Sequence, residues 1–223
     1  MSSRTRPSSL AQALMGSDSI IQLYESRLWR RNPFVALLMG ITFEQEYQTI
    51  LQAARLTGSE TILDLACGPG TYAMRLAPEV TDGVVFGLDL VWPMLTYGKR
   101  RMERDGPSNV ILLQGDASAL PFSGDHFDVV NCCGALHLFA NLDAVLHEIN
   151  RVLKGGGRFT LAAYRKRAGR LSERVARLRR DLLGIDAFHP NELENRLRQA
   201  GFHEVQCHHA RGIWLIMSAT KAG

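Results

Sequence analysis

Short apolar runs alternate with amphipathic segments from residue 61 to residue 163. Five of the apolar runs have the length of buried strands, namely 61–65, 84–88, 110–114, 127–132 and 159–163. Helices are predicted between them at 71–76, 93–104 and 142–153. This alternation is typical of parallel strands joined by crossover helices, so we expect an α/β sheet with helices on both faces.

The alternation stops after the fifth predicted strand. An arginine-rich helix is predicted at 165–183, and a shorter helix at about 189–201. Two further strands are expected at 205–210 and 213–219, separated only by two residues. A connection this short requires antiparallel pairing, so we expect the sheet to end in an antiparallel hairpin.

A helical pattern precedes the first predicted strand. We expect residues 1–56 to form an N-terminal helical lid or extension, and residues 57–223 to form a catalytic domain with a helical insert at about 164–190. The apolar side chains of the N-terminal segment fit a lid over a hydrophobic ligand. They fit equally well a set of helices packed on the sheet.

Composition excludes several classes of protein. Of the 223 residues, 46% are hydrophobic, which is too many for a wholly disordered chain. No apolar run approaches the roughly 20 residues of a membrane-spanning helix. The N-terminus lacks the apolar block of a signal peptide, although its arginines and serines leave an organelle transit segment as an alternative. We expect a soluble, cytoplasmic protein without a transmembrane segment.

The cysteines argue against a metal centre. The chain contains Cys67, Cys132, Cys133 and Cys207, and none of them forms a C-x-x-C pair. Two of them are adjacent in a predicted strand, which disfavours both a zinc site and a disulfide framework. We expect reduced thiols and no bound metal.

A glycine-rich turn follows the first predicted strand, in the sequence Asp64-Leu65-Ala66-Cys67-Gly68-Pro69-Gly70. A strand, a tight turn and a helix N-terminus present backbone N–H groups to a ligand, and the helix dipole favours a negative group there. The spacing of Gly68, Gly70 and Ala73 also fits the dinucleotide-binding fingerprint. An ordinary strand-to-helix turn remains an alternative.

Two acidic residues follow the next two predicted strands. Asp89 comes 19 residues after Gly70, where a carboxylate can accept both hydroxyls of a ribose. Asp116, in Gly115-Asp116-Ala117, can accept the amino group of an adenine. The alternatives are a solvated aspartate at a strand end for Asp89, and a turn or helix cap for Asp116.

Taken together, these motifs resemble the class I S-adenosylmethionine-dependent methyltransferases, particularly their small-molecule, type 11-like branch. The resemblance covers about residues 61–163 and rests on four ordered motifs: Asp64 to Gly70, Gly87-Leu88-Asp89, Gly115 to Phe122, and Arg151 to Gly157. It implies a doubly wound, mostly parallel, seven-stranded Rossmann-like sheet with one reversed strand, which agrees with the predicted terminal hairpin.

The chain departs from this family in two places. Ala66 stands where the family usually has glycine, and we expect the change to tighten the turn. Gly155-Gly156-Gly157 replaces the usual proline-glycine-glycine, and we expect this change to affect only the loop.

The resemblance implies S-adenosylmethionine as the cofactor and S-adenosylhomocysteine as its product. The glycine turn would hold the methionine moiety, and Asp64 would support the turn or reach the ammonium group of the ligand. The implied cofactor-binding residues are Asp64, Ala66, Cys67, Gly68, Gly70, Asp89, Leu90, Asp116, Ala117, Cys132 and Tyr24. Among them, Asp89 would bind the ribose, Asp116 and Ala117 the adenine, and Tyr24 would help to close the site.

His137 is the candidate general base. It follows the fourth predicted strand, where the pocket of a parallel sheet opens, and a histidine titrates near neutral pH. A histidine that packs beside Leu138 and Phe139 is the alternative.

The predicted helix at 165–183 combines an apolar stripe with many arginines. Such a helix can bind an anionic membrane, an acidic carrier protein or an anionic substrate, and it can equally be a solvated face over a core stripe. It lacks the interleaved aromatic residues of a nucleic-acid platform, so we expect no nucleic-acid partner.

The sequence therefore predicts an enzyme, a methyltransferase that acts on a small, hydrophobic acceptor. We expect O- or C-methylation of a quinone, a polyketide or a related secondary metabolite, with a lipid-like or carrier-bound acceptor and peripheral membrane contact left open. An NAD(P)-dependent oxidoreductase is an alternative, although the chain has no Tyr-x-x-x-Lys pair. A non-enzymatic cofactor-binding partner is another. The sequence does not indicate an oligomeric state.

Overall fold

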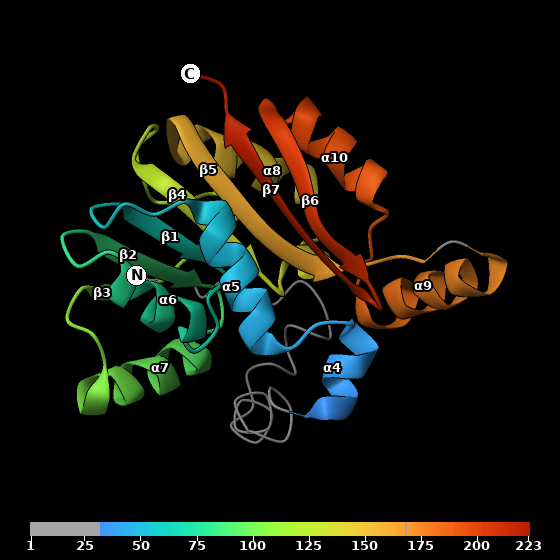
Figure 1. The fold of residues 1–223 in the computed structure, drawn as a ribbon, viewed down its shortest axis with the longest axis horizontal. Coiled ribbons are helices and arrows are strands. Elements are labelled where there is room, and N and C mark those ends of the chain that lie inside the picture. The colour runs from blue at the N-terminus through green and yellow to red at the C-terminus, as the bar shows by residue number, and fades with distance from the viewer. Residues whose placement is uncertain (1–31, 168) are drawn as a thin grey trace, which may run out of the picture.

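The computed structural model describes residues 32–167 and 169–223, which are built around one sheet (Figure 1). Within these residues the sheet has seven strands, in the order β3-β2-β1-β4-β5-β7-β6. Their bounds are Thr61–Leu65 for β1, Val84–Asp89 for β2, Val110–Gln114 for β3, Phe127–Cys133 for β4, Leu153–Tyr164 for β5, Phe202–Arg211 for β6 and Trp214–Lys221 for β7. Neighbours among β1 to β5 pair in parallel, and β7 is antiparallel to both β5 and β6. The predicted doubly wound sheet with a terminal hairpin is confirmed.

Helices cover both faces of this sheet. One face carries α5 (Phe43–Ala54), α6 (Thr71–Leu76) and α7 (Trp92–Asp105), and the other carries α8 (Leu142–Val152) and α10 (Pro190–Gln199). The 3-10 turns are η1 (Ala77–Glu79) and η2 (Leu136–Leu138). Two more helices, α4 (Pro33–Met39) and α9 (Arg170–Leu183), lie near the tip of the β6–β7 hairpin (Figure 1). None of the helices in the described ranges is long and apolar enough to cross a membrane.

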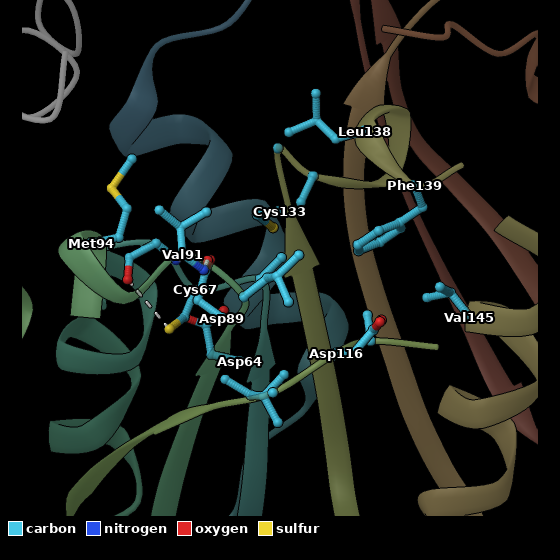
Figure 2. Close-up of a pocket in the computed structure, with 18 of the residues that line it drawn as sticks. Asp64, Cys67, Asp89, Val91, Met94, Asp116, Cys133, Leu138, Phe139 and Val145 are labelled. Carbon is cyan, nitrogen blue, oxygen red and sulfur yellow. Dashed lines mark hydrogen bonds between the residues drawn. The ribbon is translucent and has the colours of Figure 1, made fainter. Parts of the chain in front are cut away.

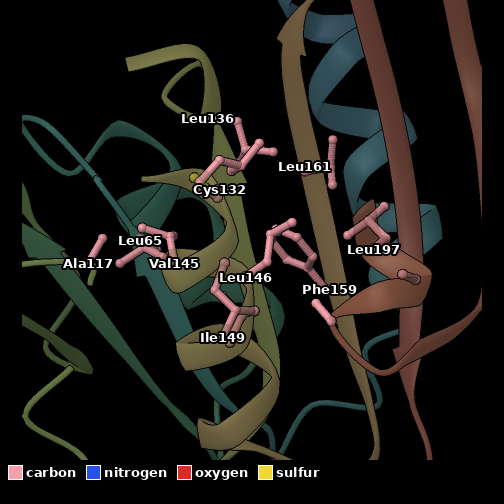
Figure 3. Close-up of a cluster of buried hydrophobic side chains, with 14 of the residues drawn as sticks. Leu65, Ala117, Cys132, Leu136, Val145, Leu146, Ile149, Phe159, Leu161 and Leu197 are labelled. Carbon is pink, nitrogen blue, oxygen red and sulfur yellow. The ribbon is translucent and has the colours of Figure 1, made fainter. Parts of the chain in front are cut away.

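The strands supply both layers of the core because their side chains alternate between the two faces. Phe159 and Leu161 of β5 pack against α8 and α10, together with Leu146 and Leu197 (Figure 3). Ala162, the residue after Leu161, packs on the other face beside α5. These strands are buried on both faces, which explains why their sequences read as continuous apolar runs.

The N-terminal helices in the described range begin and end at recognisable sequence signals. α4 begins after Asn32, whose side-chain oxygen accepts a hydrogen bond from the backbone N–H of Phe34. α5 begins with a capping box, in which Thr42 and Gln45 each bond the backbone of the other. Side chains of α5 pack on the sheet, so this part of the predicted lid belongs to the helical layer. The division of the chain at residue 56 stays a prediction.

The fifth strand is longer than predicted. The strand expected at 159–163 begins earlier, at Leu153. Leu153 pairs with Phe127 of β4, and the next pair along the strand joins Arg158 to Val129. The residues between these pairs bulge out of register. The run of three glycines therefore forms a bulge within β5 rather than a loop before it, and Gly156 takes a positive φ of 75° there.

The segment after β5 also differs from the prediction. The arginine-rich helix expected at 165–183 begins only at Arg170. Before it, the backbone N–H of Arg165 donates to the carbonyl of Ile213 at 2.8 Å, and that of Lys166 donates to the carbonyl of Phe188 at 2.9 Å. These bonds hold the chain in an extended conformation, which delays the helix.

The hairpin turn lies one residue later than predicted. Arg211, expected in the turn, still pairs with Trp214, so the turn consists of Gly212 and Ile213. Gly212 has a φ of 54°, and a Cβ there would lie 2.3 Å from the carbonyl oxygen of Leu38. Close packing of the end of α4 on this turn therefore requires a glycine.

Candidate functional site

A cavity of about 270 Å³ lies at the carboxyl ends of β1, β2, β3 and β4 (Figure 2). Its walls are the segments that follow these strands, at 66–68, 89–91, 115–118 and 133–135, with side chains from α6, α7 and α8. Ligands of open α/β sheets usually bind in a crevice at this edge. The cavity therefore brings together the segments that the sequence motifs indicated.

Asp64 is buried beneath the glycine turn and holds it in place. Its Oδ2 accepts a hydrogen bond from the backbone N–H of Ala73 at 2.9 Å, which fixes the first turn of α6. Its Oδ1 accepts from the side-chain amide of Asn131 at 2.8 Å, and Asn131 accepts from Thr160 Oγ1 at 3.0 Å. This chain of bonds ties β1 to β4 and β5, which matches a supporting role for Asp64.

The glycine turn uses three residues in the left-handed region. Ala66, Gly68 and Gly70 have φ angles of 53°, 56° and 74°. The backbone N–H of Gly70 donates to the carbonyl of Cys67 at 3.0 Å and closes the turn. A Cβ at Gly68 would meet no atom within 4 Å, so the backbone here borders the open space of the cavity. An alanine at position 66 adopts this conformation at a cost of about 1–2 kcal/mol.

Asp89 ends β2 and joins the glycine turn to the next segment. Its Oδ2 accepts from the backbone N–H of Gly68 at 2.7 Å, and its Oδ1 accepts from that of Val91 at 2.8 Å. Burial raises the pKa of the Asp89 carboxyl, and the backbone hydrogen bonds oppose this rise. A carboxylate offers about four acceptor positions, so about two remain available to a ligand after these bonds.

Asp116 organises its own turn at the tip of β3. Its Oδ1 accepts from the backbone N–H and from the hydroxyl of Ser118, both at 2.8 Å. Its carbonyl accepts from the backbone N–H of Ala119 at 3.1 Å. These contacts are those of a residue that stabilises a turn, which was the alternative considered for Asp116. The side chain of Asp116 also lines the cavity. Both of the functions considered for Asp116 are therefore compatible with its position.

The remaining walls of the cavity are largely apolar. Leu138, Phe139 and Val145 lie on one side, and Val91 and Met94 lie on the opposite side (Figure 2). They come from η2 and the residue after it, from α8, and from the start of α7. The cavity therefore has a polar end, at Asp89 and the glycine turn. The wall formed by Leu138, Phe139 and Val145, which we call the apolar side, suits an apolar ligand group.

Not every predicted cofactor residue reaches the cavity. Those that line it are Asp64, Ala66, Cys67, Gly68, Asp89, Leu90, Asp116 and Ala117. Gly70 lies behind them as the N-cap of α6. Cys132 points into the hydrophobic cluster beneath α8 (Figure 3), whereas its neighbour Cys133 lines the cavity (Figure 2). Tyr24 lies outside the described residues.

His137 does not line the cavity. Its ring lies 4.3 Å from that of Tyr164 and 6.4 Å from that of Trp214, measured between centroids. Burial, with a smaller contribution from the charge of Arg179, lowers the pKa of His137 to about 3. Its Nδ1 has no hydrogen-bond partner among the described residues. The structure thus places this ring beside the hairpin, and its function as a base stays a prediction.

Sequence reasoning missed two polar contacts at the site. Asn131 lies within a strand and carries no local signal for its bond to Asp64. Tyr72 lines the cavity, and its hydroxyl donates to Glu46 Oε1 at 2.7 Å in a buried pair that joins α6 to α5. The position of Tyr72 just after the glycine turn could have indicated it, whereas Glu46 lies 26 residues away in the chain.

Of the three cysteines near the site, Cys132 is buried, whereas Cys67 and Cys133 are half-buried and line the cavity. Burial, together with the nearby carboxylates, raises the pKa of Cys67, Cys132 and Cys133 well above the ordinary value of a thiol. They therefore stay protonated and unreactive at neutral pH. Within residues 32–167 and 169–223, no group of three or more His, Cys, Asp or Glu side chains is arranged to hold a metal ion.

Comparison with protein families gives a match over the part of the chain that builds the cavity. Residues 62–157 match a family described as a methyltransferase domain. This range begins in β1 and ends in the bulge of β5, so it includes the glycine turn, Asp89 and Asp116.

Two similar curated proteins carry the same name. The demethylmenaquinone methyltransferase of Lactococcus lactis is 41% identical over 112 residues, which cover 50% of this chain and 44% of that protein. The demethylmenaquinone methyltransferase of Symbiobacterium thermophilum is 37% identical over 119 residues, covering 52% and 47% of the two chains. This chain therefore spans about half the length of the curated relatives it matches.

Solved structures share the fold at lower identity. Phosphoethanolamine N-methyltransferase 2 of Haemonchus contortus, in complex with S-adenosyl-L-methionine, superposes with a TM-score of 0.73 and 16% identity. The match covers 93% of this chain and 58% of that one. At this identity the likeness is one of fold.

Proposed function

Residues 62–157 of the chain belong to the class I S-adenosylmethionine-dependent methyltransferases, and from this premise we infer that the protein transfers the methyl group of S-adenosylmethionine to a small, hydrophobic acceptor. The donor would bind at the polar end of the cavity, and the acceptor along its apolar side. The relatives and the solved structure described above are all named methyltransferases, so they give no support to the oxidoreductase alternative.

The position of Asp89 is the main observation that supports the proposed donor site. Its carboxylate keeps about two acceptor positions beside Gly68, where the backbone borders open space. The two adjacent hydroxyls of an adenosyl ribose are donors that fit these positions, and hydrogen bonds to a charged acceptor are the strong ones. Asp116 keeps its second oxygen for an adenine amino group, since the bonds to Ser118 both use Oδ1.

S-adenosylmethionine, when bound, supplies a methyl group that a positively charged sulfur has already activated. The task left to the chain is to orient the acceptor. Orientation of this kind lowers the activation barrier by up to roughly 7–11 kcal/mol. Leu138, Phe139 and Val145 would hold an apolar acceptor against the polar end and exclude water.

Proton removal from the acceptor needs separate consideration. A hydroxyl or an acidic carbon must lose its proton when it gains the methyl group. Among the described residues that line the cavity there is no histidine, and desolvation raises the pKa of the half-buried Cys133 thiol. We therefore propose that the acceptor loses its proton to solvent before it binds and enters the cavity in its ionised form. His137 as a base is the alternative that the sequence predicted.

The acceptor class rests on two kinds of support. The apolar side of the cavity favours an aromatic or prenylated molecule over a highly charged one. The curated relatives are named for a quinone, although they match this chain over about half their length. A quinone in its reduced, hydroxylated form, or a related polyketide, is therefore the acceptor we propose.

Two measurements test this proposal in sequence. Calorimetry should show binding of S-adenosylmethionine and S-adenosylhomocysteine, and no comparable binding of NAD or NADP. Labelled methyl transfer should then be detected to reduced demethylmenaquinone but not to phosphoethanolamine. Binding of a nicotinamide cofactor alone would overturn the donor assignment. Donor binding without transfer to any quinone or polyketide would overturn the acceptor class and favour a non-enzymatic cofactor-binding partner.

A further inference from the structure

α9 carries an exposed apolar stripe. Val175, Leu178 and Leu182 are spaced by three and four residues and therefore share one face of the helix. Their exposed fractions are 58%, 59% and 64%, whereas an apolar stripe of a globular protein normally faces the core. Arg179, which lies beside this stripe, anchors α9, because its guanidinium donates to the carbonyl of Asp186 at 3.0 Å and lies 4.8 Å from the Tyr164 ring centroid. The stripe is thus left facing outward.

Arginines accompany this stripe. Arg174 and Arg177 are exposed on α9 and form no ion pair with any other described residue. The segment 165–183 contains eight Lys or Arg residues and two Asp or Glu residues, while the whole chain has a net charge of only +4. The positive charge of the protein is therefore concentrated on α9, which exposes the apolar stripe, and on the segment that leads into it.

α4 adds apolar surface at the same place. Phe34 and Leu37 are 76% and 75% exposed, and no residue of α4 is buried. The end of α4 and the segment that leads into α9 bind the same hairpin turn: the carbonyl of Leu38 accepts from the N–H of Ile213 at 3.1 Å, and the N–H of Arg165 donates to the carbonyl of Ile213 at 2.8 Å. Figure 1 shows both helices at this end of the hairpin.

This surface lies at the edge of the sheet where the cavity lies. β5 ends at Tyr164, shortly before α9. Its parallel neighbour β4, and β1 on the far side of β4, both end at the cavity. A partner bound to α4 and α9 would therefore meet the protein at its carboxyl-end edge.

We propose that the exposed apolar side chains of α4 and α9, with the arginines of α9, dock the protein onto a bilayer surface that carries anionic headgroups. The apolar stripe enters the boundary between headgroups and acyl chains, and the guanidinium groups bind lipid phosphates. Charge complementarity selects this occupant, since the surface is both apolar and strongly positive. The proposal does not depend on the proposed methyl transfer, although it would bring a lipid-soluble acceptor close to the cavity.

A second copy of the chain is a poorer occupant of the same surface. In a two-fold dimer the stripe would meet its own copy, and the arginines beside it would be brought together. Like charges placed opposite one another across an interface cost free energy. A lipid surface supplies negative charge to every arginine instead.

Vesicle co-flotation of the full chain tests the proposal directly. We expect binding to phosphatidylcholine vesicles that contain phosphatidylglycerol, little binding to phosphatidylcholine alone, and weakening by added salt. The double variant Arg174→Gln/Arg177→Gln should lower the partition coefficient at least about tenfold, because each basic residue near an anionic surface contributes measurably to binding. The variant Leu178→Ser/Leu182→Ser should lower it to a similar extent.

Matched controls lie on a distant part of the molecule. Lys99→Gln/Arg100→Gln removes the same charge from α7, and Ile111→Ser removes a side chain of β3 that is 43% exposed. Both controls should bind vesicles as the unchanged protein does. Thermal unfolding of each variant separates a loss of docking from a loss of fold. Since all these positions lie outside the cavity lining, the affinity of each variant for S-adenosylmethionine should stay unchanged.

Several results would overturn the docking proposal. The first is no binding to any vesicle, and the second is equal binding to neutral and anionic vesicles. The third is an equal loss of binding in the control variants. The fourth is a dimer that Leu178→Ser/Leu182→Ser dissociates, in a protein that does not bind vesicles. None of these readouts measures methyl transfer, so a failure of the proposed function would be seen separately.

Discussion

The polar end and the apolar side of the cavity are built in different ways. At the polar end, short hydrogen bonds to the backbone hold each segment, such as the 2.7 Å bond from the Gly68 N–H to Asp89. On the apolar side, η2 is held partly from far along the chain, because the N–H of Asp186 donates to the carbonyl of His137 at 2.8 Å. In the first region, carboxylates at strand ends bind backbone N–H groups of neighbouring segments, and in the second, packing and a backbone bond to a distant segment hold the walls.

This difference indicates how the two regions should respond to substitution. A change at the polar end should alter affinity for the donor, because backbone N–H groups and one carboxylate define that site. A change on the apolar side should alter use of the acceptor or stability and leave donor affinity intact. Each of the following predictions tests this separation.

The largest effect is expected at Asp89. Asp89→Asn keeps the size of the side chain but removes its charge, and hydrogen bonds to a charged group contribute about 1.5–3 kcal/mol each. With two ribose bonds weakened, we expect a loss of S-adenosylhomocysteine affinity of about one hundredfold, measured by calorimetry. Asp82→Asn, an exposed aspartate in the turn before β2, is the control and should bind as before. Equal affinity in both variants would remove the assigned role of Asp89.

His137 is expected to make the stability of the protein strongly dependent on pH. Burial lowers its pKa to about 3, whereas an unfolded histidine titrates near 6.5. Between these values only the unfolded state binds the proton, so stability falls as the pH drops. Relative to His137→Phe, the free energy of unfolding should decline by about 1.4 kcal/mol per pH unit below pH 6, as measured by urea denaturation.

The control for this measurement is His147→Phe, at an exposed position of α8, which should keep the pH dependence of the unchanged protein. His137→Phe also addresses catalysis. Turnover that survives the substitution at neutral pH would leave His137 as a packing residue, and a loss of turnover with unchanged donor affinity would support the predicted base. Parallel pH profiles for His137→Phe and the unchanged protein would contradict the burial argument.

An intermediate effect is expected at Phe139, on the apolar side. Phe139→Ala removes aromatic surface that lines the cavity, and a buried aromatic side chain contributes roughly 1.5–3 kcal/mol. We expect the KM for a quinol acceptor to rise about tenfold, with donor affinity changed less than about twofold. Ile111→Ala, outside the cavity, is the control. An equal loss of donor affinity in Phe139→Ala would show that the two regions are not separable.

Much of the fold could be predicted because its signals are local. The strand at 61–65 and the helix at 71–76 were predicted with the bounds that the structure shows, since apolar runs and a glycine turn mark them. The bounds of β5 and α9 were not, because a bulge opposite Phe127 and the bond from Arg165 to Ile213 depend on neighbouring strands.

The residues of the site also fall into two groups, those that local sequence signals indicate and those whose orientation depends on packing. Gly68 and Asp89 could be predicted, because each stands at the end of a strand that the sequence marks. Cys132 and Cys133 could not be distinguished, because the resemblance does not say which of two adjacent side chains faces the cavity. His137 was expected near the cavity from its place in the chain. Its ring turns toward Tyr164 instead, which only the packing of β5 and β7 determines.

The smallest effect is expected at Ala66, where this chain departs from the family's usual glycine. Ala66 has a φ of 53°, which is strained for alanine, while glycine adopts it freely. Ala66→Gly should raise the free energy of unfolding by about 1 kcal/mol, since relief of the strain exceeds the added entropy of the unfolded chain. Ala176→Gly, within α9, provides the opposite control and should lower it by about 1 kcal/mol. If Ala66→Gly is also destabilising, the side chain at position 66 must stabilise the turn by packing, and the polar end of the cavity would depend on side-chain contacts as the apolar side does.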